Sequence, residues 1–212
     1  VGFKVRSALQ SQHCVRLIIS TDNADIRAEA EAHGAAAPFV RPASLATDVA
    51  SSDEVVLHAM NYIEKTENRQ YDAIMVLEPS SPFARGVDYD AAIDLFERVD
   101  AGCVVGMCQT EINSIFIGPL AEDGKANQII QAFASVDDRR RQAFRPEFTM
   151  NGALYLVAWD LMQTTGSIYG APNRTYGHTM DRAHSMNVDT MYDLKLAEYF
   201  VREGLLDMAD WN

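Results

Sequence analysis

The sequence predicts an α/β fold, in which a mostly parallel β-sheet is covered by helices on both faces. Short apolar runs rich in β-branched residues alternate with segments of helical periodicity along the first half of the chain. The helical segments are long enough to act as the crossover connections that join parallel strands. The 212 residues, of which 48% are hydrophobic and 23% charged, have the composition of an ordinary globular protein. We therefore expect residues 1–212 to form a single domain.

The individual elements are assigned from apolar patterning and from capping signals. Ser51 and Glu54 have the spacing of a capping box, which predicts that a helix begins there. Gly34 is a natural end for the preceding helix. In chain order, we then expect a strand at 15–20, helices at 22–33 and 51–67, a strand at 72–77, a helix at 87–99, strands at 103–108 and 152–157, a short helix, and a final helix at 190–203.

The regular alternation stops between residues 109 and 150. This stretch contains short extended pieces, a Glu122-Asp123-Gly124 turn and the basic run 139–141. Such a long irregular segment is unusual in a compact domain unless it is functional or forms an interface. We interpret residues 109–150 as a lid or a dimerisation arm, with a surface insertion of no role as the alternative. Residues 166–178 are rich in Gly, Tyr and Pro and are expected to form a loop.

Composition also excludes several kinds of partner. The net charge of −12 argues against nucleic acid, because phosphate backbones attract basic surfaces. The longest apolar runs, VRLII and AIMVL, are too short to span a bilayer, which predicts no membrane association. Residues 1–14 carry charges and show no signal-peptide pattern. Three cysteines without CxxC spacing indicate thiols in a reducing compartment, so we expect a cytoplasmic protein.

Four polar clusters carry the chemistry, and the first lies at residues 41–52. Arg41 stands in a Pro-containing loop just before the helix at 51–67. The free N–H groups of that helix N-terminus, together with a guanidinium, favour an anionic or nucleotide ligand. A surface arginine beside an ordinary helix cap is the alternative.

The other three clusters each have a structural alternative as well. Residues 78–85 (EPSSPFAR) follow a buried strand and contain hydroxyls and rigid prolines. These side chains either line a pocket or belong to a turn that ends the strand. The arginines of residues 139–145 either bind a carboxylate of a ligand or form a solvent-exposed surface. Asn187 and Asp189 alternate on an extended segment and so point the same way, as ligands of Mg²⁺ would. Asp189 is equally suited to cap the helix that follows it.

Taken in order along the chain, these clusters make the sequence resemble the CMP-sialic acid synthetases, which form the acylneuraminate cytidylyltransferase family. The resemblance extends over almost the whole chain, and the stretches at 41–52 and 151–155 are its most specific parts. The matching stretches are Ser20-Thr21-Asp22, RPASLATDVASS at 41–52, VLEPSSP at 76–82, Arg141-Gln142, NGALY at 151–155 and NVD at 187–189.

The resemblance implies a Rossmann-like fold, a homodimer built through the irregular arm and a Mg²⁺-dependent reaction. In that reaction the anomeric hydroxyl of an acidic nine-carbon sugar attacks the α-phosphate of CTP, giving a CMP-sugar and pyrophosphate. It implies cytidine contacts for Arg41, Ala50 and Ser52, sugar contacts for Glu78, Arg141, Gln142 and Tyr155, and a catalytic metal site at Asn187 and Asp189.

Three departures from the family pattern leave alternatives open. Family members open with a strand and a Gly-, Arg-, Ser- and Lys-bearing loop around the CTP phosphates. Residues 1–14 look like the helix that follows this loop, so the loop itself is lacking from the sequence and we expect activity to depend on it. Glu78 stands where the family usually has Gln, and a carboxylate repels an acidic sugar unless it is protonated or paired. Asn187 replaces an Asp, which weakens Mg²⁺ binding. An inactive nucleotide- or sugar-binding relative, a dimeric regulatory module, and a transferase for an eight-carbon acid sugar are the alternatives.

Overall fold

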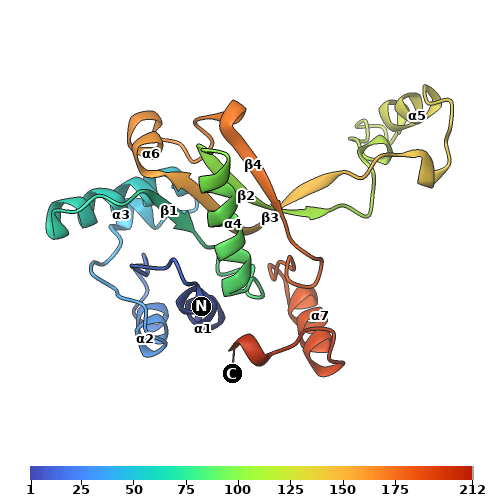
Figure 1. Cartoon of the computed structure of the whole chain (residues 1–212). Helices are drawn as coiled ribbons and strands as arrows, with labels where there is room; N and C mark the ends of the chain where they lie inside the picture. Colours follow the sequence, from blue (N-terminus) through green and yellow to red (C-terminus); the bar gives the residue numbers. More distant parts are fainter. Residues whose placement is uncertain (212) are drawn as a thin grey trace.

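The centre of the structure is a four-stranded mixed sheet with strand order β1-β3-β2-β4. The structure is a computed structural model that describes residues 1–211, without the side chains of Arg141 and Asp210. Strand β3 runs antiparallel to β1 and β2, whereas β2 and β4 are parallel (Figure 1). Three of the four strands therefore share one direction. The strands are β1 (Ala73–Val76), β2 (Cys103–Gln109), β3 (Phe148–Ala158) and β4 (Thr175–Thr179).

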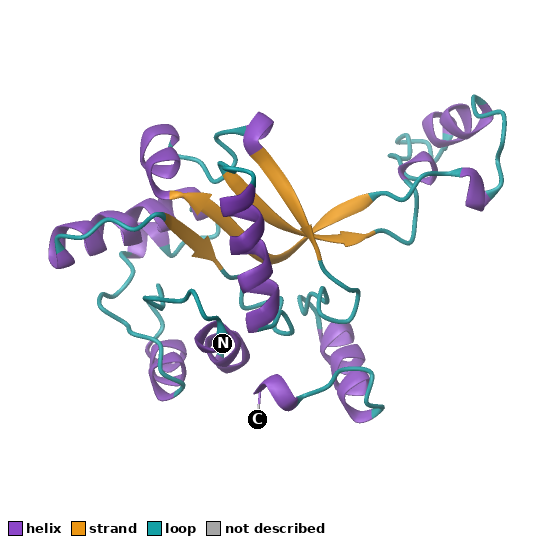
Figure 2. Cartoon of the chain, in the orientation of Figure 1, coloured by secondary structure: helices purple, strands orange, loops and turns teal. Residues whose placement is uncertain are grey.

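Helices cover both faces of this sheet, as Figure 2 shows, which confirms the predicted α/β fold class. One apolar cluster joins α1 (Gly2–Gln10) and α4 (Gly86–Arg98) to the sheet, and a second joins α3 (Ser52–Glu67) and α6 (Trp159–Thr165). Side chains alternate between the faces along a strand. Val104 accordingly packs in the first cluster, and its neighbours Cys103 and Val105 pack in the second.

The capping signals in the sequence mark the helix ends correctly. Ser51 and Glu54 form a capping box at the start of α3, and Gly34 follows α2 (Ala24–Ala32) with φ of 104°. The final helix, α7 (Met191–Arg202), is capped by Thr190 rather than by Asp189. The Thr190 hydroxyl accepts the Asp193 backbone N–H, so the Asp189 carboxylate is not the cap of this helix. None of the described helices is long and apolar enough to cross a membrane.

The predicted strand at 15–20 is wrong. This segment makes a single parallel bridge, between Ile18 and Ala36, in which the Ile19 N–H donates to the Ala36 carbonyl at 2.8 Å. A groove of about 680 Å³ separates residues 13–18 from β1. The segment therefore has a bridging partner on one side only, which is too little to form a ladder.

Three further differences concern the second half of the chain. Most of strand β4 falls within the predicted loop 166–178, because its parallel pairing with β2 outweighs a composition typical of loops. Strand β3 begins at Phe148, which pairs with Gln109 well before the predicted start at residue 152. The irregular stretch contains a helix, α5 (Asn127–Ala134), where only extended pieces were expected.

Residues 109–150 form an arm that projects away from the sheet, at the end where β2 and β3 leave the body (Figure 1). Its interior is a small aromatic contact, in which the Phe116 ring centroid lies 5.3 Å from that of Phe133 and 5.6 Å from that of Phe144. None of the described side chains between residues 109 and 150 is buried. The arm thus has almost no core of its own.

Candidate functional site

Two of the predicted polar clusters, residues 78–85 and 187–189, follow strands that end at one edge of the sheet. Strands β1, β2 and β4 run in the same direction, so their carboxyl ends lie together. Ligands of open α/β sheets bind at that edge. Residues 78–82 follow β1, the arm follows β2, and residues 180–189 follow β4.

Ser81 connects three of the clusters. Its side chain is fully buried, and its Oγ lies 3.0 Å from the Asn151 carbonyl oxygen and contacts the side-chain oxygen of Asn187. The Val188 N–H donates to the Ser80 carbonyl at 2.7 Å. The structure therefore brings the EPSSP, NGALY and NVD stretches into direct contact, although they are far apart in the sequence.

Strand β3 changes course where it meets Ser81. Its ladder with β2 pairs Tyr155 with Val105 and then Met150 with Met107, so residues 151–154 face Gly106 alone. Gly152 has φ of 68°, which favours glycine, and a Cβ added to Gly106 would lie 2.5 Å from the Asn151 side-chain oxygen. The two glycines allow this bulge, which we call the β3 bulge (residues 151–154).

The stretch predicted to hold cytidine, 41–52, lies beside another matching stretch, 20–22. The Arg41 guanidinium donates to Ser20 Oγ at 3.1 Å and contacts the Ser20 carbonyl oxygen, which joins the loop at 41–52 to the end of the 15–20 segment. Ala50 is half-buried and Ser52 is the exposed first residue of α3. The helix N-terminus therefore presents its N–H groups beside this loop.

Tyr155 lies on the α3 face of the sheet, opposite Val76 in the ladder. Its ring centroid is 6.0 Å from that of Tyr169, and the rings are nearly perpendicular. Burial, with a smaller contribution from Tyr155, raises the pKa of Tyr169 to about 12. Glu78 is half-buried just after β1, two residues beyond Val76, the residue that pairs with Tyr155 in the ladder.

Asn187 and Asp189 are both exposed, and they differ in their surroundings. The Asn187 amide oxygen is engaged by Ser81, whereas the Asp189 backbone N–H donates to Asp193. Among residues 1–211, no group of three or more His, Cys, Asp or Glu side chains is arranged to hold a metal. One carboxylate and one amide oxygen nevertheless suit Mg²⁺, which usually keeps several waters and is bound by one or two protein ligands plus substrate phosphates.

Arg141 and Gln142 lie apart from the other predicted sugar residues. They begin a single 3₁₀ turn within the arm, where Gln142 is exposed and the Arg141 side chain lies outside the described part of the structure. Glu78 and Tyr155, in contrast, belong to the body. The predicted sugar set is thus divided between the body and the arm.

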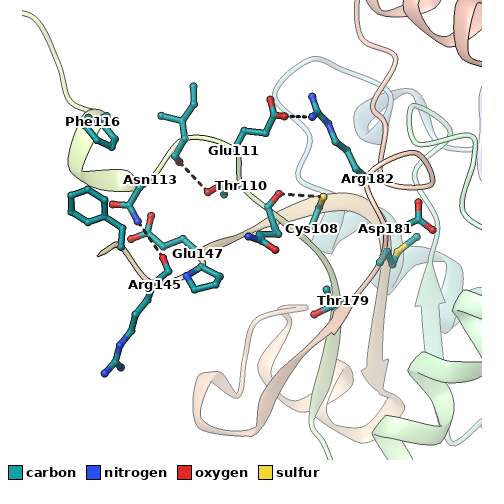
Figure 3. Close-up of a pocket in the computed structure, with 15 residues that line it drawn as sticks. Cys108, Thr110, Glu111, Asn113, Phe116, Arg145, Glu147, Thr179, Asp181 and Arg182 are labelled. Atoms are coloured by element: carbon teal, nitrogen blue, oxygen red, sulfur yellow. Dashed lines mark hydrogen bonds and ion pairs between the residues drawn. The ribbon is translucent and has the colours of Figure 1, made fainter. Parts of the chain in front are cut away.

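A cleft of about 730 Å³ lies at the base of the arm, beside residues 179–182 (Figure 3). Arg182 forms an ion pair with Glu111 across this cleft, and the Glu147 carboxylate accepts the Ser114 hydroxyl at 2.8 Å. Sequence reasoning missed these residues. They come from three separate segments, and nothing in their linear spacing indicates that they meet.

Two histidines precede the NVD stretch, His178 on β4 and His184 in the loop after it. His184 Nδ1 lies 2.6 Å from the Asp181 carboxylate, and its ring stacks on Trp211. His178 is half-buried on β4, and burial lowers its pKa.

Comparison with known proteins gives relatives over nearly the whole chain. The chain is 27% identical over 198 residues to the N-acylneuraminate cytidylyltransferase of Escherichia coli O18:K1:H7, which covers 93% of the chain but only 44% of that relative. It is 23% identical over 202 residues to the CMP-N,N'-diacetyllegionaminic acid synthase of Legionella pneumophila, with 93% and 83% covered.

The chain is a homologue of the acylneuraminate cytidylyltransferases. This homology confirms the resemblance found in the sequence. Among solved structures, CMP:2-keto-3-deoxy-manno-octonic acid synthetase in complex with CTP matches 95% of the chain and 87% of its own, with a TM-score of 0.66 and 12% identity. At that identity the match shows a shared fold and nothing further. No protein-family model matches the chain.

Proposed function

We propose that this homologue of the acylneuraminate cytidylyltransferases couples CTP to an acidic nine-carbon sugar, releasing pyrophosphate. The observation that carries the proposal is the contact of the EPSSP, NGALY and NVD stretches through Ser81 at the carboxyl edge of the sheet. The relatives that cover most of the chain have this type of reaction in their names. The three free cysteines support a reducing, cytoplasmic setting.

The residues divide into three roles in this proposal. The Arg41 loop and the N-terminus of α3, with Ala50 and Ser52, would bind the cytidine end of CTP. Glu78 and Tyr155 would lie beside the sugar, which brings its anomeric hydroxyl to the α-phosphate. A new P–O bond then forms as the bond to pyrophosphate breaks. Positioning and charge neutralisation supply most of the catalysis in such phosphoryl chemistry.

Mg²⁺ fits the oxygen donors at Asp189 and Asn187 and would neutralise charge on the phosphates when bound. The exposed Asp189 carboxylate is the stronger donor, because the Asn187 oxygen already contacts Ser81. We therefore assign Asp189 as the main ligand and Asn187 as a neutral, weaker one.

A homodimer formed through the arm completes the proposal. Exposed apolar side chains on the arm support it, among them Ile112, Ile117, Leu120 and Ile130. Arg141 and Gln142 lie on the same arm, so pairing would bring two more polar groups toward a sugar bound to a neighbouring body.

A binding protein without turnover is the second candidate. It is favoured by the occupied Asn187 oxygen and by the small number of acidic groups at the metal side. A transferase for an eight-carbon acid sugar ranks below both.

The test is pyrophosphate release by protein expressed from its complete gene, with CTP, Mg²⁺ and a panel of acidic sugars. We expect turnover with a nine-carbon acid and a loss of about 100-fold or more in Asp189→Asn, because a metal ligand is removed. Asp160→Asn, an exposed change on α6, is the matched control. CTP binding without turnover of any sugar would instead establish the binding protein.

A further inference from the structure

Lys4 is a charged side chain that the proposed reaction does not use, yet it is 5% exposed. Lysine is almost never buried unless it is paired, because removing its charge from water is costly. Its Nζ donates to the Ala153 carbonyl oxygen at 2.7 Å and to the Tyr89 hydroxyl at 3.3 Å. A methionine side chain would fill a similar volume without that cost. The presence of lysine at this position therefore indicates that its amino group has a specific role.

The Ala153 carbonyl belongs to the β3 bulge. Residues 151–154 fall between the paired positions of the β2–β3 ladder, so this carbonyl takes its donor from α1. An unpaired buried carbonyl costs free energy comparable to a lost hydrogen bond. Lys4 therefore supports the bulge from the side of α1 and α4.

The opposite side of the same bulge carries the candidate site. The Asn151 carbonyl accepts the Ser81 hydroxyl, and the Asn151 side-chain amide donates to Ser185 Oγ at 2.9 Å. A shift of the bulge would move Ser81, and with it the contact to Asn187. The position of Lys4 is thus transmitted to the site through one short piece of strand.

We propose that Lys4 is a positioning residue of the candidate site, which fixes the β3 bulge through its hydrogen bond to the Ala153 carbonyl. The inference rests on the proposed function for its effect on substrate, but its structural part does not. It assigns a role to a residue outside every motif of the sequence.

The charge balance around Lys4 supports this role. Burial lowers its pKa from 10.5 to about 7, and attraction to Glu78 and to Asp88 opposes that fall. Near neutral pH the protonated fraction of Lys4 therefore offsets part of the negative charge that Glu78 would present to an acidic sugar.

The first readout is hydrogen exchange of the backbone amides of residues 148–158 in Lys4→Met. We expect exchange at the β3 bulge to rise about tenfold or more, while β2 and β4 stay protected, because only local opening changes. Lys65→Met, the same change at an exposed lysine of α3, is the control and should leave exchange at the bulge as it is.

The second readout separates substrate positioning from stability. In Lys4→Met we expect the KM for the acidic sugar to rise about tenfold, as for loss of an outer-shell support, with the KM for CTP nearly unchanged. Adding Glu78→Gln should restore part of this loss, because the unpaired carboxylate is then gone. If Lys4→Met does not fold, Lys4→Gln is measured instead. Because Gln keeps a donor without the charge, exchange at the bulge should rise less than tenfold, while the KM for the acidic sugar should still rise.

Unchanged exchange at the bulge, or faster exchange spread evenly over the sheet, would overturn the inference. An equal rise in both KM values would do the same. If the unchanged protein turns over no acidic sugar, the proposed function fails, and the exchange experiment alone decides the role of Lys4.

Discussion

The body and the arm of this chain differ in how they use apolar side chains. In the body, two clusters pack against opposite faces of the sheet, and residues such as Met60 and Leu154 are completely buried. In the arm, none of the described side chains is buried, and Ile117 and Ile130 are 64% and 61% exposed. Hydrophobic burial is the main favourable term in folding, so the body is stable through its own contacts. The arm has no comparable source of stability within one chain.

This difference explains why the arm is the place to look for a partner. Exposed apolar patches on a protein surface mark interaction sites. A second copy of the chain would bury these side chains, and the predictions below test each side of the comparison.

The largest expected effect is on the body. Met60→Ala on α3 removes a side chain with no exposed surface, and we expect it to lower the free energy of unfolding by about 2–5 kcal/mol. Ile130→Ala on the arm should lower it by less than about 0.5 kcal/mol under conditions where the protein is monomeric. Urea denaturation measures both. Equal losses would mean that the arm has a core of its own.

The next effect is on association. Replacing Ile117 and Ile130 together by Asp places two charges on the exposed apolar surface of the arm. Each substitution at the centre of the interface is expected to weaken association by about 2 kcal/mol or more. Sedimentation equilibrium should then give the monomer mass, with an unfolding midpoint close to that of the parent protein. Val49→Asp, at a 91% exposed position of the body, is the control. A parent protein that is already monomeric would contradict the role of the arm.

The body was far more predictable from sequence than the arm, and for a physical reason. Helices such as 51–67 carry their own start signals, so the Ser51–Glu54 box located α3 to within a residue. Strand β4 carries no such signal, since its pairing with β2 depends on residues far away in the chain. The segment at 15–20 has the composition of a strand but only one bridging partner, which composition cannot reveal.

The same distinction holds for the candidate site. Its motifs were visible along the chain, and the structure brings three of them together at Ser81. Lys4, Arg182 and Ser185 were missed because their contacts join segments distant in sequence. No spacing rule connects such residues before the fold is known.

A third prediction concerns the pH dependence of body stability. The pKa of Lys4 is about 7 in the folded protein and 10.5 as the reference value, so between these values the unfolded state holds a proton that the folded state lacks. Stability should therefore rise with pH across this window relative to Lys4→Met, and the difference should be flat below pH 7, where both states are protonated. Urea denaturation from pH 6 to 9.5 measures it. The groups around Lys4 are Glu78, Asp88 and Tyr89, and a difference that falls with pH would contradict the lowering of its pKa by burial.

The smallest expected effect is at the start of α3. Ser51→Ala removes the hydroxyl that accepts the Glu54 N–H and should lower the free energy of unfolding by about 1 kcal/mol. Because this helix end belongs to the proposed binding site for the cytidine end of CTP, the affinity for CTP, measured by calorimetry, should fall as well. Ser135→Ala, at the C-terminal end of α5 in the arm, is the matched control and should leave CTP binding as it is.

The most direct test of the account is the identity of the product. Protein from the complete gene is incubated with CTP, Mg²⁺ and an equimolar mixture of sialic, legionaminic and eight-carbon acid sugars, and the nucleotide sugars are resolved by mass spectrometry. The account predicts a CMP-linked nine-carbon acid together with an equal amount of pyrophosphate. A CMP-linked eight-carbon acid alone, or CTP bound without any nucleotide sugar, would contradict it.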